Sequence, residues 1–354
     1  MISEKSGISP QHRGLNIYRL FDQSVGLNGI LAWTPNESGL MDTAVGGVRN
    51  LSGRGMSENN ALDLACDLAL AMKDKSWAIP GLKIGGAKTV LYGPGKKTPQ
   101  FLKAMGASLE QFNLRYGTAD LPRYVYSVDV NTSVADVAAS HGKLKCWSEG
   151  DPSPKTSEGV ASSVLACLKM NPARIRAMIP SVYITGVCGA VGSMVAKLLI
   201  EAGVMVYGKD ITTDLARIAD MVRMGVIMLS GDDFPSVDVY VPCAMEHCLN
   251  KITIPQLWQV GIWAVVGSAN CQLANGDEDA LLLHKYGILY AVDYVVNRGG
   301  VIFVAGQWHF MKEPDRVISE TGNEVVNILR LSLQYDKPTT IVAREYFNSF
   351  RIAA

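Results

Sequence analysis

The chain has 354 residues, enough for two domains, and its 33 basic and 33 acidic side chains give a formal net charge of zero. This balance gives no electrostatic reason to expect nucleic acid or an anionic membrane as a partner. No apolar run reaches membrane-spanning length, and the N-terminus has no apolar signal core. We therefore expect a cytoplasmic protein.

The seven cysteines are scattered, and none forms a CxxC pair. Cys243, His247 and Cys248 lie close together in the sequence, but they are too few ligands for a good zinc site. Buried thiols in a reducing compartment are the better interpretation, and no metal is predicted.

The first predicted elements are two short strands, 16–20 and 29–33, joined by a polar turn. The adjacent glycines of the next segment, 44–50, could bring backbone N–H groups close to an anion or form an ordinary turn. Ser57 is a good N-cap for a helix over about 58–73, whose leucines repeat at helical spacing.

Two lysines follow in an apolar stretch rich in glycine and alanine. Lys75 closes the predicted helix, and Lys88 follows a predicted turn at 85–86 and precedes a strand. A lysine ammonium in a dry pocket beside a second one can bind an anion or activate water. From this stretch alone, two surface lysines with buried stems remain the favoured alternative.

An amphipathic helix is predicted at about 99–116, and a strand at 124–128 by its β-branched and aromatic residues. That strand leads into Asp129, at a position where catalytic groups of α/β proteins project. The alternative for Asp129 is a turn or N-cap aspartate. The polar residues 141–157 are typical of a hinge between domains.

The second half of the chain predicts a dinucleotide-binding unit. It contains a strand at 181–186, a glycine turn at 186–192, a helix, a strand at 204–207 and then Asp210. The turn has the form Gly-x-x-Gly-x-x-Gly, one residue longer at its start than the usual pattern. Close backbone approach and a helix N-terminus would suit a pyrophosphate, and the acid would suit a ribose diol.

The rest of the second half continues with short strands and helical segments, as is typical of a parallel sheet. Short strands are predicted at 237–243, 263–270 and 287–292, followed by a helix over 293–304. The tail, from about 314 to 351, has helical periodicity and is expected to pack on the first domain.

Eight segments occur in a characteristic order from about residue 15 to the C-terminus. They are Gly46-Gly-Val-Arg49, Gly85-Gly-Ala-Lys88, Asp129-Val-Asn-Thr132, the turn 186–192, Val241-Pro-Cys-Ala244, Thr253-Ile-Pro-Gln-Leu257, Gly267-Ser-Ala-Asn270 and Tyr290-Ala-Val-Asp-Tyr-Val-Val-Asn-Arg-Gly-Gly300. Together they resemble the leucine/phenylalanine/valine dehydrogenase branch of the glutamate dehydrogenase superfamily. The resemblance implies reversible oxidative deamination of an L-amino acid to a 2-oxo acid and ammonia, with hydride passing to a nicotinamide.

The resemblance also implies residue roles. Lys88 would polarise the carbonyl and activate water, and Asp129 would move protons at the amino group. Lys75 would bind the substrate carboxylate. Its implied helpers at the carboxylate are Gly46, Gly47 and Asn270.

The cofactor is expected to be NAD, since Asp210 would repel the 2′-phosphate of NADP, although the adjacent Lys209 weakens this inference. The resemblance implies a larger set of cofactor-binding residues: Gly186, Gly189, Ala190, Val191, Gly192, Asp210, Thr156, Cys243, Ala244 and Asn270. It also implies a homo-oligomer.

The positions that match the family's side-chain pocket are Val45, Met72, Ser127, Val301 and Val304. They are mostly apolar and offer no cation for a second carboxylate, which predicts an aliphatic or aromatic substrate rather than glutamate. Leucine, phenylalanine and tryptophan all remain open.

Several residues depart from the family pattern: Val48, Cys271, Arg298 and Phe303. Arg298 is interpreted as an exposed helix residue, with a position facing the cleft as the alternative. The altered residues also leave open a specialised biosynthetic enzyme that acts on an imine or an unusual 2-oxo acid, or that couples two metabolites. A non-enzymatic nucleotide-binding protein is disfavoured, because binding NAD alone would not require the two lysines.

The predicted fold is therefore α/β with two domains and a cleft between them. Residues 1–145 form an N-terminal α/β domain for substrate binding and oligomerisation, joined by C-terminal helices at about 325–354. Residues 146–324 form a Rossmann-like doubly wound dinucleotide-binding domain.

Overall fold

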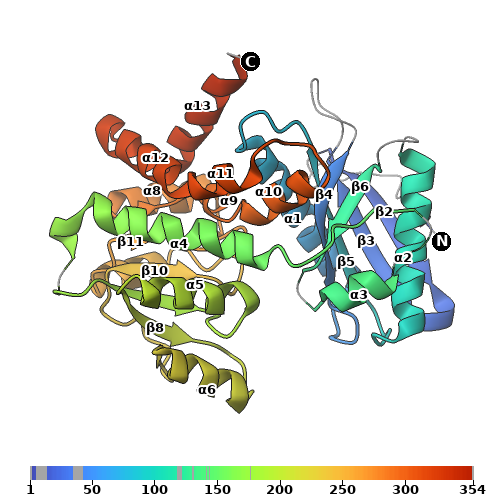
Figure 1. Cartoon of the computed structure of the whole chain (residues 1–354), viewed down its shortest axis with the longest axis horizontal. Helices are drawn as coiled ribbons and strands as arrows, with labels where there is room; N and C mark the ends of the chain where they lie inside the picture. Colours follow the sequence, from blue (N-terminus) through green and yellow to red (C-terminus); the bar gives the residue numbers. More distant parts are fainter. Residues whose placement is uncertain are drawn as a thin grey trace. The chain divides into compact units, whose positions relative to one another are not determined.

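The computed structural model describes residues 2–4, 14–34, 43–117, 122–129, 131–140, 142, 144–175 and 177–352. The chain divides into two compact units (Figure 1). Unit 1 consists of Met1–Pro152 and Phe303–Lys312, and unit 2 of Ser153–Ile302 and Glu313–Ala354. The boundary therefore follows residue 152, where the sequence predicted it after residue 145.

Unit 1 is built on a six-stranded sheet in the order β1-β2-β3-β5-β4-β6. The strands are β1 (Ile2–Glu4), β2 (Asn16–Asp22), β3 (Leu27–Trp33), β4 (Ala44–Asn50), β5 (Gly85–Tyr92) and β6 (Tyr124–Ser127). Strand β3 is antiparallel to β2 and β5, whereas β4 runs parallel to β5 and β6. The helices of this unit are α1 (Glu58–Trp77), α2 (Pro99–Tyr116) and α3 (Val134–Ser140), with a short 3-10 turn η2 (Gln23–Val25).

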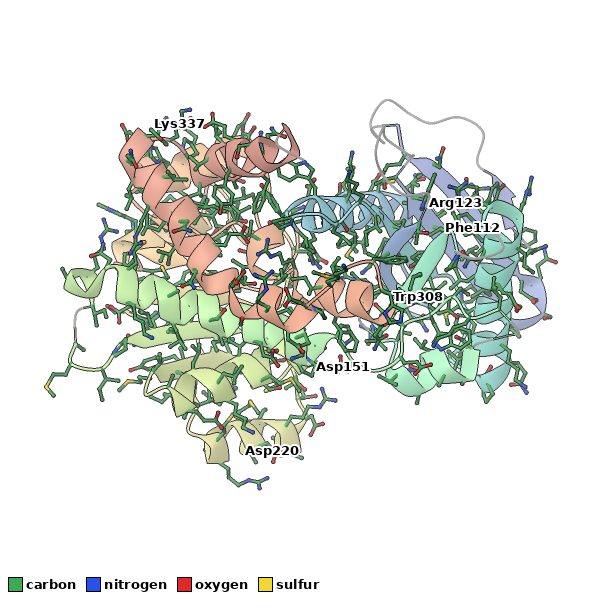
Figure 2. The ribbon with its side chains drawn as sticks, turned by 45° about the horizontal axis from the view of Figure 1, so that its top comes forward. Phe112, Arg123, Asp151, Asp220, Trp308 and Lys337 are labelled. Atoms are coloured by element: carbon green, nitrogen blue, oxygen red, sulfur yellow. The ribbon has the colours of Figure 1, made fainter. Side chains whose placement is uncertain are left out.

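The sheet of unit 1 is covered on both faces because its strands alternate between two cores. Ile17 and Ile30 belong to the core that α1 covers. Their neighbours Tyr18 and Leu31 belong to the opposite core, beneath α2. Phe112 of α2, labelled in Figure 2, packs edge-on against Tyr18 with ring centroids 4.9 Å apart.

Gly85 and Gly86 are part of strand β5, and not the turn that the sequence predicted. A Cβ atom on Gly86 would lie 2.2 Å from the backbone nitrogen of Lys73 in α1. On Gly46, within strand β4, a Cβ atom would lie 1.8 Å from the carbonyl oxygen of Ala87. These glycines therefore allow α1 and two strands to approach one another closely.

Unit 2 contains a six-stranded sheet in the order β12-β11-β10-β7-β8-β9, in which every pair of neighbours is parallel. The strands are β7 (Ser181–Thr185), β8 (Met205–Lys209), β9 (Ile227–Met228), β10 (Val239–Pro242), β11 (Ala264–Val265) and β12 (Leu289–Tyr290). Numbered within this sheet, the order is 3-2-1-4-5-6 reversed, which is the order of a dinucleotide-binding fold. The predicted Rossmann-like fold is confirmed.

Helices flank the sheet of unit 2, and α4 and α5 run alongside each other in Figure 1. The helices are α4 (Ser153–Met170), α5 (Ala190–Glu201), α6 (Leu215–Met224), α7 (Thr253–Gln259), α8 (Asp277–Lys285), α9 (Asp293–Val296), α11 (Pro314–Ser319), α12 (Thr321–Tyr335) and α13 (Thr339–Ile352), with a 3-10 turn η3 (Pro172–Arg174). Helix α10 (Gly299–Gln307) begins in unit 2 and ends in unit 1. Helix α4 begins inside the segment 141–157 that was predicted as a hinge.

The C-terminal helices pack on unit 2, whereas the sequence predicted that they would join the first domain. Helix α12 packs against α4, and α13 packs against α12 and α8, with Lys337 in the turn between α12 and α13 (Figure 2). A Cβ atom on Gly322 would lie 2.6 Å from the carbonyl oxygen of Ser162, so α12 lies directly on α4. Val325 and Leu329 bury the apolar stripe that sequence periodicity detects without identifying its partner.

In the part of the chain that the structure describes, we find no helix that combines the length and the apolar character needed to cross a membrane.

Candidate active site

Lys75 and Lys88 are both buried in unit 1. Lys75 lies in the last turn of α1 and is 7% exposed, and Lys88 lies in β5 and is 4% exposed. Of the other two lysines nearby, Lys83 is exposed and Lys73 is half-buried. The interpretation of Lys75 and Lys88 as surface lysines is therefore wrong, and their charges need partners inside the fold.

Asp129 supplies such a partner at the end of β6. Its Oδ2 atom forms an ion pair with Lys88 Nζ, and Arg49 Nε of β4 lies 3.5 Å from the same oxygen. Arg49 is only 8% exposed. Two cations beside one carboxylate stabilise its ionised form, and a lysine beside a carboxylate can exchange protons with it.

Sequence reasoning gave Arg49 no role, although it lies in a family-like segment. The available signal was its spacing, because residues two apart in a strand face the same side of the sheet. Arg49 therefore shares a face with Gly47, beside which Lys88 and Asp129 lie.

Gly47 lies directly beside the pair formed by Lys88 and Asp129. A Cβ atom at this position would be 2.9 Å from Asp129 Cβ and 3.1 Å from Lys88 Nζ. The Gly47 carbonyl oxygen accepts a hydrogen bond of 3.0 Å from the Tyr124 hydroxyl. Burial raises the pKa of Tyr124 well above its usual value, so this hydroxyl keeps its proton and remains a donor.

Asp129 and Thr132 are paired through their backbone groups. Thr132 N–H donates to the Asp129 carbonyl at 2.8 Å, and Asp129 N–H donates back to Thr132 at 3.3 Å. Asn131, between them in the sequence, has a φ of 60°, and its Nδ2 donates to the carbonyl of Asn50 at 3.1 Å. Arg54 donates to Asn131 Oδ1 at 3.0 Å. Asp129 is thus both a strand-end residue and a turn residue, so the two sequence interpretations are compatible.

The glycine turn of unit 2 forms a close backbone cradle. Gly186 has a φ of 74°, and a Cβ atom there would lie 2.9 Å from the Cys243 carbonyl and 3.0 Å from Ala244 Cα. On Gly192, a Cβ atom would lie 2.1 Å from the Gly186 carbonyl oxygen. Gly189 is the N-cap of α5 and makes no side-chain capping bond. The N-terminus of α5, with Ala190 and Val191 in its first turn, therefore fits an anion such as a pyrophosphate.

Asp210 follows β8 and holds this turn. Its Oδ2 accepts a hydrogen bond from Cys188 N–H at 2.9 Å, and its Oδ1 accepts one from Thr212 N–H at 2.9 Å. Cys188 belongs to the part of the glycine turn that is one residue longer than the usual pattern, and its hydrogen bond to Asp210 holds that longer segment in place. Each carboxylate oxygen keeps a further lone pair for a ribose hydroxyl. Lys209 is ion-paired with Asp232.

Thr156 and Asn270 lie at the same carboxyl edge of the sheet. Ser157 donates to the Val191 carbonyl at 3.3 Å, which places the first turn of α4 against α5. A Cβ atom on Gly299 would lie 2.9 Å from Thr156 N, and the neighbouring Asn297 donates to Asn270 Oδ1 at 3.1 Å. The predicted cofactor-binding residues thus come together in unit 2.

Cys243 is the thiol among the predicted cofactor-binding residues. Burial raises the pKa of the Cys243 thiol, so this residue contributes a neutral group. The described residues contain no group of three or more His, Cys, Asp or Glu side chains that could hold a metal ion.

Several known proteins similar to this chain are amino acid dehydrogenases. Residues 209–310 match the model of the glutamate/leucine/phenylalanine/valine dehydrogenases. Leucine dehydrogenase of Bacillus cereus is 30% identical over 347 residues, which cover 94% of this chain and 89% of that protein. Phenylalanine dehydrogenase of Lysinibacillus sphaericus is 31% identical over 337 residues, which cover 91% of this chain and 84% of that protein. The structure of L-tryptophan dehydrogenase from Nostoc punctiforme matches with a TM-score of 0.67 at 25% identity, covering 96% of each chain.

The chain belongs to this family. It is an amino acid dehydrogenase, an oxidoreductase that acts on a CH–NH2 group with a nicotinamide cofactor. The resemblance inferred from the eight sequence segments is confirmed.

The predicted pocket residues of the dehydrogenase are distributed over both units. Val45, Met72, Ser127 and Val304 belong to unit 1, and Val301 belongs to unit 2. The three valines and Ser127 are buried and Met72 is half-buried. Their role in holding a substrate side chain stays a prediction.

Arg298 of the dehydrogenase is not exposed, and the favoured sequence interpretation is wrong. The residue is 1% exposed and forms an ion pair with Glu324 of α12. Burial raises the pKa of Tyr346 of α13, and the nearby Glu324 raises it further while Arg298 lowers it. Arg298 therefore fastens the α9–α10 connection to the C-terminal helices within unit 2.

Proposed function

We propose that this dehydrogenase oxidises a hydrophobic L-amino acid to its 2-oxo acid and ammonia, reversibly and with NAD. The observation that supports it best is the buried ion pair between Lys88 and Asp129, with Arg49 and Gly47 beside it. A protein that only bound a nucleotide would gain nothing from burying these charges, which are costly to remove from water. Groups that move protons at a reacting carbon do require them.

In the proposed reaction each side chain has one task. The Lys75 ammonium binds the substrate carboxylate, assisted by the Asn270 amide and the backbone at Gly46 and Gly47. When bound, the nicotinamide accepts a hydride from the substrate Cα.

Lys88 stabilises the negative charge that develops on oxygen as water adds to the resulting imine, and it also orients that water. Asp129 takes a proton from the attacking water and returns it to the departing amine. The reverse reaction uses the same groups in the opposite order.

The substrate side chain is proposed to be aliphatic or aromatic. Val45, Met72, Val301 and Val304 carry no charge and could not pair with a second carboxylate. The names of the leucine, phenylalanine and tryptophan dehydrogenases among the similar proteins support the same substrate class.

NAD is proposed in preference to NADP. The Asp210 carboxylate is fixed at the end of β8 by two backbone N–H groups, and it would repel a 2′-phosphate. Lys209 is ion-paired with Asp232, which lessens its ability to attract that phosphate. We also propose a homo-oligomer, as the family resemblance implies, and a cytoplasmic location, as the scattered cysteines suggest. Light scattering on the purified protein measures its subunit number.

The test is a panel of the common L-amino acids with NAD and with NADP, scored by the absorbance of the reduced cofactor. We expect turnover with one or more apolar amino acids and NAD, and little with glutamate. Lys88→Ala should abolish turnover, and Asp129→Asn should lower kcat by roughly 100-fold or more.

Lys83→Ala removes an exposed lysine near the same strand and serves as the matched control, with kcat unchanged. The proposal is wrong if the panel gives no activity, if glutamate is the best substrate, or if Lys88→Ala keeps its activity.

A further inference from the structure

Asn297 lies between α9 and α10, and the residue is 3% exposed. Its Nδ2 atom lies 3.0 Å from the Ser268 carbonyl oxygen, 3.4 Å from the Ala269 carbonyl oxygen and 3.1 Å from Asn270 Oδ1. Two of these acceptors are backbone atoms in the loop after β11, and the third is the side chain of Asn270. Asn297 therefore reaches the loop that carries a proposed substrate-binding residue.

These contacts determine which way both amides face. Backbone carbonyl oxygens can only accept, so the nitrogen of the Asn297 amide, and not its oxygen, must face Ser268 and Ala269. That nitrogen is a donor, so Asn270 must turn Oδ1 towards it. The two N–H bonds of Asn270 Nδ2 then point away from Asn297. Nitrogen and oxygen of an isolated amide are hard to tell apart, but these neighbours decide the assignment.

We propose that Asn297 is a positioning residue, which holds Asn270 so that its N–H groups are presented to the substrate carboxylate. This inference rests on the proposed function of Asn270. A carboxylate only accepts hydrogen bonds, so a flipped Asn270 would turn an oxygen towards another oxygen and lose the interaction. Only the correct orientation of the Asn270 amide therefore allows a charge-assisted hydrogen bond to the substrate carboxylate.

Asn297 is itself rigidly held. Its N–H donates to the Asp293 carbonyl at 2.8 Å, and the next residue, Arg298, is buried and ion-paired with Glu324. A Cβ atom on the following Gly299 would lie 2.1 Å from the Lys155 carbonyl oxygen, so this backbone lies directly on α4. A side chain supported in this way can orient another with little loss of order.

Asn297 Oδ1 gives an independent indication. This oxygen is buried and has no hydrogen-bond partner among the described residues. An unsatisfied buried oxygen is destabilising, so an asparagine is a poor choice here if stability alone is required. The contacts of Nδ2 explain why an asparagine suits this position.

The test is a double-mutant cycle between Asn297→Ala and Asn270→Ala, scored by KM for the best amino acid. Asn297→Ala alone should raise that KM by roughly 10- to 100-fold. In the Asn270→Ala background the same substitution should change KM less than about twofold, because the effect passes through Asn270. Asn297→Asp, which replaces the donor with an acceptor of the same shape, should raise KM further.

Gln272→Met is the matched control for loop loosening. Gln272 is fully buried, and its Nε2 donates to the carbonyls of Gly267 at 3.0 Å and Ala269 at 2.9 Å. Gln272→Met should lower the melting temperature. Any effect of this substitution on KM should be the same in the wild-type and Asn270→Ala backgrounds. If Asn297→Ala is likewise additive with Asn270→Ala, Asn297 has a merely structural role and the proposal fails.

A second measurement does not depend on turnover. Crystals of the wild type and of Asn297→Ala that diffract to about 1.2 Å or better would distinguish Asn270 nitrogen from oxygen. We expect one amide orientation in the wild type and a flipped or mixed orientation in the variant. An unchanged Asn270 in the variant would overturn the positioning role. A wild type that oxidises no amino acid would instead overturn the proposed function, and the crystal structures would still decide the role of Asn297.

Discussion

Gly47→Ala tests the proposed catalytic pair of Lys88 and Asp129 by adding a single methyl group beside it. The added carbon would lie 2.9 Å from Asp129 Cβ, 3.1 Å from Lys88 Nζ and 3.2 Å from the Val128 carbonyl oxygen. Favourable contacts between carbon atoms require about 3.5–4.0 Å. Gly47 is in strand β4 and does not have a positive φ, so the alanine backbone is unstrained and the side-chain contacts alone produce the effect.

Relieving these contacts requires Asp129 and Lys88 to move by roughly 0.5–1 Å from the positions they occupy beside glycine. A misplacement of about 1 Å can cost about 100-fold in rate. We therefore expect kcat to fall by roughly 10- to 100-fold, or about 1.4–2.8 kcal/mol in activation free energy. NAD affinity should not change, because the glycine turn belongs to unit 2. Steady-state kinetics measure kcat, and calorimetry measures NAD binding.

Gly29→Ala is the matched control in the same sheet. Its Cβ atom would lie 2.8 Å from Leu91 Cδ2, the end of a flexible side chain in the core. This variant should lose stability in a thermal melt and keep its kcat. A wild-type kcat in Gly47→Ala, or equal losses of kcat in the two variants, would refute the proposed closeness of Gly47 to the reacting groups.

Three further outcomes are expected. Gly192→Ala should weaken NAD binding by at least about tenfold in calorimetry, since its Cβ atom would lie 2.1 Å from the Gly186 carbonyl oxygen; unchanged affinity would contradict the cradle. Arg298→Met should lower the free energy of unfolding by about 3–5 kcal/mol in a denaturant titration, because it leaves Glu324 without its ion-pair partner; a loss below about 1 kcal/mol would show that the pair is dispensable. Burial raises the pKa of the Cys167 thiol from 9.0 to about 12. The unfolded chain loses this proton first, so stability should fall as pH rises from about 9 towards 12, and Cys167→Ala should flatten that slope.

The dinucleotide-binding unit could be predicted from sequence because its signals are local. A buried strand, three glycines, an apolar helix face and an acid at the end of the next strand all appear within about thirty residues. The structure confirms β7, α5 and β8 at these positions. Strand ends were less accurate: 263–270 was predicted as a strand, and only Ala264–Val265 pairs as one.

Glycines outside that unit were harder to interpret. Gly85 and Gly86 have the composition of a turn, yet they lie in β5 because α1 approaches the strand there. The sequence shows a glycine in the same way whether it allows a turn or close packing. Only the position of the partner, supplied by a distant part of the chain, distinguishes the two.

The sequence by itself determined the family, the α/β class and the candidate residues Lys75, Lys88 and Asp129. These follow from residue types in a fixed order and from backbone preferences that act between near neighbours. The tertiary structure alone decided that Arg49 joins Lys88 at one carboxylate oxygen, and that the lysines are buried.

The tertiary structure also decided that Arg298 is buried against Glu324 and that Asn297 faces Asn270. Burial and pairing of this kind depend on which elements pack together. A polar side chain becomes costly, and therefore informative, only when the fold removes water from around it. Periodicity in a sequence indicates which face of a helix or strand is covered, but it does not identify the charge on the covering element.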